Sequence, residues 1–339
     1  MARKNGNRGG QGLKVAAQMS AEPSAEEFAF NRQMGVEYAV AWASGPNVPA
    51  EYYKQCSILY RDNGIALAVF GSSSVHLVDS IVLNLADRDA KVEEYKQHLR
   101  NLGAAGIPCT TYAHMANSVW STPYESTRGG ARARAFDFSR VDEGSGQSGK
   151  YSGKLTHGRE YSEAEIWEHY TSFIREVAPV AEEVGVRIGI HPDDPPGITL
   201  GGIPRPIFSS FEGYKRALEI ADSPNVGLCL CIGCWLEGGE TMGMNVLETI
   251  RYFGERGQIF KVHFRNIDQP LPHFVETFVD NGYMDMYGVM KTLGEVGFDG
   301  VLIPDHIPLM GGDENVGTAY SIAYMKAMVN RAVAELAAA

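Results

Sequence analysis

Short apolar runs alternate along this chain with longer segments whose apolar residues recur at helical spacing. The runs are bounded by glycine, proline or polar residues and have the length of buried strands. Eight strands are predicted: Leu13–Ala17, Val36–Ala41, Ile65–Phe70, Ile107–Tyr112, Val186–His191, Val226–Cys231, Ile259–His263 and Val301–Asp305. Because helical segments separate them, we expect these strands to lie parallel in one sheet.

The helical segments follow the strands in turn. They are predicted at Ala25–Met34, Ala50–Asp62, Lys91–Ala105, Glu163–Val184, Phe211–Ala221, Gly243–Arg256, Met284–Val296 and Thr318–Ala338. Several end at a glycine that leads into the next strand, as Gly185 does before Val186, which is typical of a repeated βα unit. Eight such units predict an α/β fold of the (β/α)8 TIM-barrel type. We assign residues 13–339 to one barrel domain and residues 1–12 to a flexible N-terminal tail.

The alternation fails once, between Tyr112 and Glu163. This stretch is rich in glycine, serine and arginine, and it follows the C-terminal end of the fourth strand, where loops build the active site of a barrel. We interpret residues 113–162 as an active-site insertion with short elements of its own, with a disordered surface loop as the alternative. Its expected inward contributors are His114, Trp120 and Arg128.

Four successive strands end at a residue that can bind a metal. His191 ends an apolar run just before a proline-rich segment, and Cys231, His263 and Asp305 hold the same place in later strands. The C-terminal ends of parallel barrel strands meet at one rim, so these four side chains are expected to converge on one ion. One thiolate, two imidazoles and one carboxylate disfavour Mg²⁺ and Ca²⁺ and permit Mn²⁺, Fe²⁺, Co²⁺ or Zn²⁺.

Other polar residues lie close to these strand ends. Asp193 and Asp194 follow His191 and are expected either to orient the ligands or to hold a turn, with equal weight. Arg265 and Asn266, just past His263, are placed to reach an anionic substrate, since a guanidinium matches a carboxylate. His306, beside Asp305, is the best-placed proton carrier.

Two cations are predicted inside the barrel by strand alternation. If His263 points inward, so does Lys261, and Arg187 shares the face of His191. Buried cations are costly unless paired, so both are expected to meet carboxylates or the site itself. A structural zinc site built from Cys229, Cys231 and Cys234 is not favoured, because no second pair of cysteines completes it.

Composition narrows the classes of protein that the chain can represent. The net charge is −11 and the 30 basic residues are dispersed, so neither a nucleic-acid partner nor a charged membrane surface is expected. No apolar run approaches the roughly 20 residues needed to span a bilayer. The five cysteines are odd in number, which favours reduced thiols. We therefore expect a cytoplasmic protein, and a homo-oligomer, with a small-molecule substrate.

Several motifs together resemble one enzyme family. The chain contains HPDDPP at 191–196, GLCLCIG at 227–233, KVHFRN at 261–266 and PDH at 304–306. This set is similar to mannonate dehydratase, a metal-dependent lyase whose barrel is related to xylose isomerase, over roughly residues 65–330. The resemblance implies Mn²⁺ bound by His191, Cys231, His263 and Asp305, and conversion of D-mannonate into 2-keto-3-deoxygluconate and water. It also implies a helping tyrosine near the C-terminus, Tyr320 or Tyr324, and substrate contacts from His76 and Trp120.

The sequence departs from the family pattern around the sugar-reading rim. The family's tryptophan-rich first strand and histidine-containing second-strand motif are replaced by residues 16–23 and 41–49. Ala113, Val279 and Ile303 stand where or near where the family has asparagine, histidine and arginine. A sugar acid related to D-mannonate is therefore a second candidate substrate. A metal-dependent sugar isomerase or epimerase, and a catalytically silent sensor of sugar acids, are the alternative functions.

Overall fold

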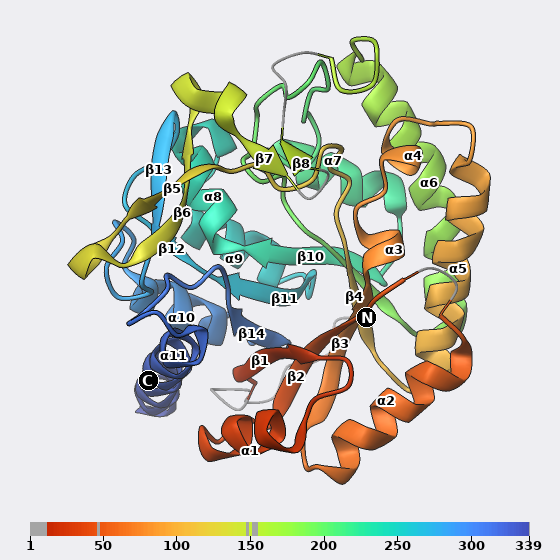
Figure 1. The fold of residues 1–339 in the computed structure, drawn as a ribbon. Helices are drawn as coiled ribbons and strands as arrows, with labels where there is room; N and C mark the ends of the chain where they lie inside the picture. Colours follow the sequence, from red (N-terminus) through yellow and green to blue (C-terminus); the bar gives the residue numbers. More distant parts are fainter. Residues whose placement is uncertain (1–11, 46–47, 147–148, 151–154, 339) are drawn as a thin grey trace.

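Eight parallel strands form the centre of the protein in a computed structural model that describes residues 12–45, 48–146, 149–150 and 155–338 (Figure 1). They are β1 (Lys14–Ser20), β2 (Tyr38–Ala43), β3 (Ala66–Ser72), β4 (Cys109–Tyr112), β9 (Arg187–Ile190), β10 (Val226–Cys231), β11 (Ile259–Phe264) and β14 (Val301–Pro304). Hydrogen bonds join them in the order β3-β2-β1-β14-β11-β10-β9-β4, and β3 also contacts β4. The predicted (β/α)8 barrel is confirmed. The predicted tail, residues 1–12, lies outside the described residues apart from Gly12.

Helices surround this barrel, as Figure 1 shows. The predicted ones are present as α1 (Ala25–Gln33), α2 (Ala50–Asp62), α5 (Arg88–Ala104), α6 (Glu163–Val184), α7 (Phe211–Ala221), α9 (Val246–Gly254), α10 (Met286–Glu295) and α11 (Glu314–Ala338). Three short helices were not predicted: α3 (Ser73–His76), α4 (Asp79–Val82) and α8 (Ile232–Gly238). Of these, α3 and α8 begin directly after barrel strands, so they lie at the rim that carries the candidate site.

Local sequence explains where α6 begins and ends. Ser162 accepts a hydrogen bond from the backbone of Glu165, whose side chain bonds back to Ser162, so a capping box satisfies the first turn. At the other end Gly185 has a φ of 68°, a left-handed conformation that glycine adopts without a steric penalty. The helix is thereby fixed between the insertion and β9, the strand that ends next to His191.

The insertion after β4 builds a second sheet over the C-terminal rim. Strands β5 (Thr122–Ser126) and β6 (Arg132–Asp137) pair with each other, and β6 also pairs antiparallel with β13 (His273–Thr277), which pairs with β12 (Asn266–Ile267). A further short pair, β7 (Ser145–Gly146) and β8 (Gly149–Lys150), follows. The described part of the insertion therefore has the short elements that were predicted, although their partner strand β13 was not foreseen.

The two predicted barrel cations have different kinds of partner. Nζ of Lys261 lies 3.5 Å from the hydroxyl of Thr111 and 5.9 Å from the centre of the Trp42 ring. Arg187 lies over the ring of Phe260, at 5.1 Å. Among the described residues neither cation forms an ion pair with a carboxylate. Lys261 meets the candidate site itself, which was the other expectation, because Thr111 and Trp42 line a cavity together with His191 and His263. For Arg187 the expectation is wrong, because its partner is an aromatic ring. The register between β10 and β11 shifts at Phe260, which brings this aromatic ring into the barrel beside Arg187.

Candidate metal centre

Four donor side chains meet at the C-terminal ends of four barrel strands. β9 stops at Ile190 because prolines follow, and this leaves His191 just beyond the strand. Cys231 is the last residue of β10, His263 is the last but one of β11, and Asp305 follows β14. We call these four residues the donor cluster. Their common position in parallel neighbouring strands brings them together, as the sequence pattern predicted.

The donor atoms face one another at short distances. Nε2 of His191 lies 3.2 Å from Nδ1 of His263, which lies 3.4 Å from Oδ1 of Asp305. Sγ of Cys231 lies 3.9 Å from Oδ2 of Asp305. The other nitrogen of His191, Nδ1, bonds to the carbonyl oxygen of Pro192 at 2.7 Å, which fixes the ring so that Nε2 faces the cluster.

The electrostatic surroundings prepare these groups to act as ligands. Burial lowers the pKa of His263 to about 4, so the imidazole is neutral near pH 7. Burial disfavours a thiolate at Cys231, but the hydrogen bond from Cys234 and the charge of Arg265 prevail and lower the pKa of Cys231 well below its usual range. Burial likewise opposes ionisation of Asp305, yet His306, His263 and Arg265 lower its pKa.

The donor chemistry fits a borderline divalent ion. One thiolate, two neutral imidazoles and one carboxylate are ligands that such ions accept. Nε2 of His263 is buried without a hydrogen-bonding partner among the described residues, so the protein's own contacts leave this ring incompletely satisfied.

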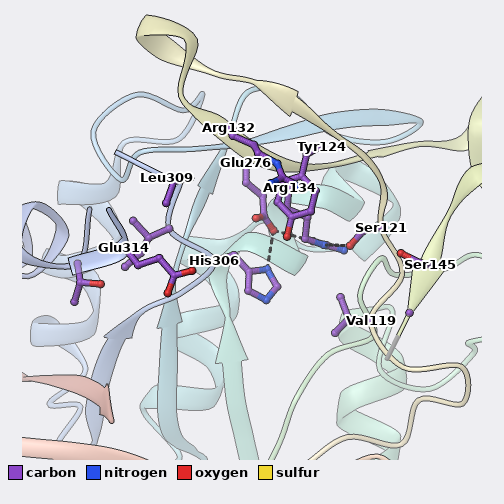
Figure 2. Close-up of a pocket in the computed structure, with 13 residues that line it drawn as sticks. Val119, Ser121, Tyr124, Arg132, Arg134, Ser145, Glu276, His306, Leu309 and Glu314 are labelled. Atoms are coloured by element: carbon purple, nitrogen blue, oxygen red, sulfur yellow. Dashed lines mark hydrogen bonds and ion pairs between the residues drawn. The ribbon is translucent and has the colours of Figure 1, made fainter. Parts of the chain in front are cut away.

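His306 lies beside the donor cluster in an unusual backbone conformation. Its φ is 44°, a left-handed value that is uncommon for residues other than glycine. Nδ1 of the ring lies 2.8 Å from Oε1 of Glu276 on β13, and Figure 2 shows the ring projecting toward the centre of a cavity. Burial disfavours the charged ring, but the carboxylates of Asp305 and Glu276 outweigh it and raise the pKa of His306 to about 9. The side chain is therefore protonated near neutral pH.

A network of buried ion pairs packs against His306 and the donor cluster. Arg265 contacts Asp194 at 3.0 Å, Glu237 at 2.7 Å and Glu276 at 3.0 Å, and its Nη1 also lies against Nδ1 of His306. Arg134 on β6 contacts Glu276 at 2.8 Å. Arg134 also contacts Asp194, Glu237 and Ser121, and Arg265 also contacts Asp305. These pairs join the insertion sheet to the barrel rim.

Gly233 leaves the space that Arg265 needs. A Cβ atom at this position would lie 1.9 Å from Nε of Arg265, which is too close for any real contact. We therefore expect Gly233→Ala to displace the guanidinium and to lower the free energy of unfolding by about 1–3 kcal/mol, as overpacking does. Denaturant unfolding measures this change. Glu240→Ala, at an exposed position beyond the same helix, is the control, and an equal stability of both variants would contradict the tight contact.

Two cavities open onto His306. The inner cavity, of about 340 Å³, is lined by three members of the donor cluster and by residues of the barrel, among them His76, Trp42, Gln18 and Thr111. The outer cavity, of about 660 Å³, lies between the insertion sheet and the segment after β14 (Figure 2). Val119 and His306 line both. A molecule held at the donor cluster would therefore lie against His306.

The predicted substrate contacts differ in their surroundings. His76 lines the inner cavity, bonds through Nδ1 to the carbonyl of Thr111 at 3.1 Å and packs edge-on against Trp42. The side chain of Asn266 bonds to the backbone of Ile267 and Met284, so it holds two loops together. Trp120 is buried, with its indole nitrogen 3.3 Å from the carbonyl of Val141. Arg265 contacts the protein's own carboxylates. Substrate binding by these four residues remains a prediction.

The two aspartates after His191 have different partners. Asp193 accepts a hydrogen bond from Ser209 at 2.8 Å, and burial raises its pKa to about 6. Asp194 lies in the ion network, where burial is outweighed by Arg134 and Arg265, and its pKa is lowered. The backbone here is clamped by Arg205, which donates to the carbonyl of Asp194 at 2.7 Å. Asp193 and Asp194 thus support the loop that carries His191.

The tyrosines of α11 lie away from the donor cluster. Tyr320 contacts Arg128 at 3.4 Å and stacks on Tyr324, while Arg128 forms an ion pair with Asp280 at 2.7 Å. Among the described residues, those that line the two cavities include neither tyrosine. Their catalytic assistance remains a prediction. The expected inward position of Arg128 is wrong, because its side chain is 44% exposed and pairs with Asp280.

The insertion contributes other residues than those predicted. His114 is buried between Tyr112, whose hydroxyl lies 2.8 Å from its Nδ1, and Tyr170, so it is a core residue. The cavity lining comes instead from Ser121, Tyr124, Arg132 and Arg134, among others. The alternation of arginine and alanine from Arg132 to Ala135 was a signal that one face of this segment is polar. The sequence did not say that this face would meet Glu276.

Convergent polar side chains at the C-terminal rim of a (β/α)8 barrel are typical of the active site of a TIM-barrel enzyme. The chain matches the family model for D-mannonate dehydratase (UxuA) over residues 32–336. It is 32% identical over 271 residues to mannonate dehydratase 2 of Halalkalibacterium halodurans, covering 74% of this chain and 76% of that protein. It is 33% identical to mannonate dehydratase of Thermotoga neapolitana, covering 74% and 75%. This chain belongs to the mannonate dehydratase family, whose named activity is that of a hydro-lyase.

Solved structures agree with this assignment. The mannonate dehydratase of Streptococcus suis superposes with a TM-score of 0.80 and 25% identity, covering 94% of this chain and 95% of that one. A D-psicose 3-epimerase of Clostridium cellulolyticum has a TM-score of 0.60 and 13% identity, which shows a common fold alone. Within the described residues, none of the helices has both the length and the apolar character required to cross a membrane.

Proposed function

We propose that this protein is a metal-dependent lyase that dehydrates a sugar acid, D-mannonate or a close relative, to a 2-keto-3-deoxy acid and water. The observation that supports this most directly is the meeting of four donor side chains beside His306, in a chain that belongs to the mannonate dehydratase family. His191, Cys231, His263 and Asp305 would hold the ion. Mn²⁺ is the ion we expect, with Fe²⁺, Co²⁺ and Zn²⁺ as alternatives.

The reaction removes a proton from the carbon next to the carboxylate and a hydroxyl group from the following carbon. A bound divalent ion supplies Lewis acidity, which makes that proton more acidic. His306 uses Nδ1 to contact Glu276, so Nε2 is the atom left to carry a proton from the carbon to the departing hydroxyl, which leaves as water. Glu276 and Arg265 hold the imidazole in place. Tyr320 or Tyr324 remains the predicted assistant.

An assay of product separates this function from its alternative. We expect incubation with D-mannonate and Mn²⁺ to yield a 2-keto-3-deoxy acid, detected by its semicarbazone or by mass as a loss of one water. An isomerase or epimerase would instead give a product of unchanged mass. A panel of C5 and C6 sugar acids should accompany D-mannonate. The segments that differ from the family pattern, 16–23 and 41–49, include Gln18 on β1 and Trp42 on β2, and both of these side chains line the inner cavity. Full metal occupancy without turnover on any of them would favour a binding protein.

A further inference from the structure

Cys234 lies next to the donor cluster and has no role in the proposed reaction. Cys231 is the N-cap of α8 and Cys234 is the third residue of that helix, with its backbone N–H donating to Sγ of Cys231 at 3.5 Å. Residues three apart lie on the same side of a helical turn. Both side chains are completely buried. The second thiol is therefore held at the first one, inside the protein.

Two overlapping groups of donors surround the same place. The donor atoms of His191, Cys231 and Cys234 all lie within 4.8 Å of one another, and so do those of Cys231, His263 and Asp305. Cys231 belongs to both groups, and the two histidines that distinguish them are 3.2 Å apart. Five donor side chains therefore form two groups that share Cys231, one more side chain than a four-coordinate ion uses.

A third group of donors is already neutralised by the protein. Asp194, Cys234 and Glu237 also lie within 4.8 Å of one another. However, Nη2 of Arg265 lies 3.0 Å from Oδ2 of Asp194, 3.2 Å from Sγ of Cys234 and 2.7 Å from Oε1 of Glu237. A metal ion would have to displace this guanidinium. Cys234 is thus available to an ion only from the side of Cys231, with Arg265 behind its sulfur.

We propose that Cys234 is a further metal ligand, used when the ion is soft. Thiolates favour softer ions and carboxylates favour harder ones, so Zn²⁺ would be held by His191, His263, Cys231 and Cys234 in place of Asp305. Mn²⁺ would keep Asp305 as its ligand. Cys234 gives up its thiol proton to solvent on binding, and no electron is transferred. The inference rests on the proposed metal centre and adds a ligand that discriminates between ions.

Titration of the metal-free protein with Cd²⁺, a soft substitute for Zn²⁺, tests this ligand. The ultraviolet charge-transfer absorbance of bound Cd²⁺ increases with the number of thiolates that it contacts. We expect Cys234→Ser to show about half the absorbance per bound ion of the wild type. Cys229→Ser should match the wild type, because Cys229 is equally buried but belongs to neither donor group. In competition with a chelator, Cys234→Ser should weaken Zn²⁺ binding about tenfold or more and leave Mn²⁺ binding unchanged.

The outcomes distinguish Cys234 from the metal centre as a whole. Wild-type absorbance in Cys234→Ser, together with a reduced value in Cys231→Ser, would overturn the role of Cys234 alone. A wild-type protein that binds no ion, or a Cys231→Ser variant with an unchanged signal, would overturn the proposed centre itself. Cys234→Ala provides a second variant without a hydroxyl group and should give the same halved signal. Far-ultraviolet circular dichroism verifies that each variant is folded.

Discussion

Substitution of His306 by alanine is expected to lower kcat by about 10²–10⁴-fold while the protein keeps its Mn²⁺. The first effect follows because a positioned proton donor typically contributes that factor. The second follows because His306 bonds to Glu276 and is not a member of the donor cluster. Steady-state kinetics on the substrate found in the panel, together with metal analysis of the same preparation, measures both.

The matched control for this variant is His157→Ala. His157 pairs with Asp79 at 3.2 Å, and it lines neither cavity among the described residues. Its removal should leave kcat and metal content as in the wild type. If the His306 variant turned over at the wild-type rate, the assignment of His306 as the proton carrier would be refuted. Loss of metal from that variant would instead place His306 among the groups that hold the ion.

Removal of a metal-binding side chain should lower the affinity for Mn²⁺ as well as the turnover. We expect His191→Ala to weaken Mn²⁺ binding by more than about 100-fold, because the loss of a group that merely orients a ligand typically costs about 10–100-fold. Nε2 of His191 lies 3.2 Å from the nearest imidazole nitrogen, so its removal opens one side of the donor cluster. Turnover should then become undetectable at micromolar Mn²⁺.

Equilibrium binding of Mn²⁺, followed by electron paramagnetic resonance of the free ion, measures this loss directly. The same His157→Ala control applies, and activity should return partly when Mn²⁺ is raised to millimolar concentrations. Retention of wild-type affinity by His191→Ala would mean that the ion binds elsewhere. Comparison with His306→Ala then separates a ligand from a proton carrier, since only the first should change binding.

The barrel and the donor cluster were accessible to prediction because their signals are local. Four of the apolar runs end at a residue that can bind a metal, and the chain turns there, so His191, Cys231, His263 and Asp305 could be recognised as strand-end residues. The parallel order of the strands then follows from the alternation with helices. Convergence of the four side chains needed no further information than the fold itself.

The partners of His306 were not accessible in this way. Glu276 lies on β13 and Arg134 on β6, and these strands come together by an antiparallel pairing across roughly 140 residues of sequence. No periodicity within either segment specifies the other strand. The same reason explains why the partner of Lys261 was left open between a carboxylate and the site itself. Alternation predicts that Lys261 points inward, but the neighbours that it meets, Thr111 and Trp42, come from other strands.

The sequence by itself determined the eight βα units, the strand ends that carry the donors and the family to which the chain is similar, because these depend on the order of residues within short segments. Only the tertiary structure decided that Arg265 faces the protein's own carboxylates, that Glu276 holds His306 and that Cys234 lies against the donor cluster. Those contacts depend on the packing of the insertion sheet and of helix α8 onto the barrel rim, which brings together segments that are distant in sequence.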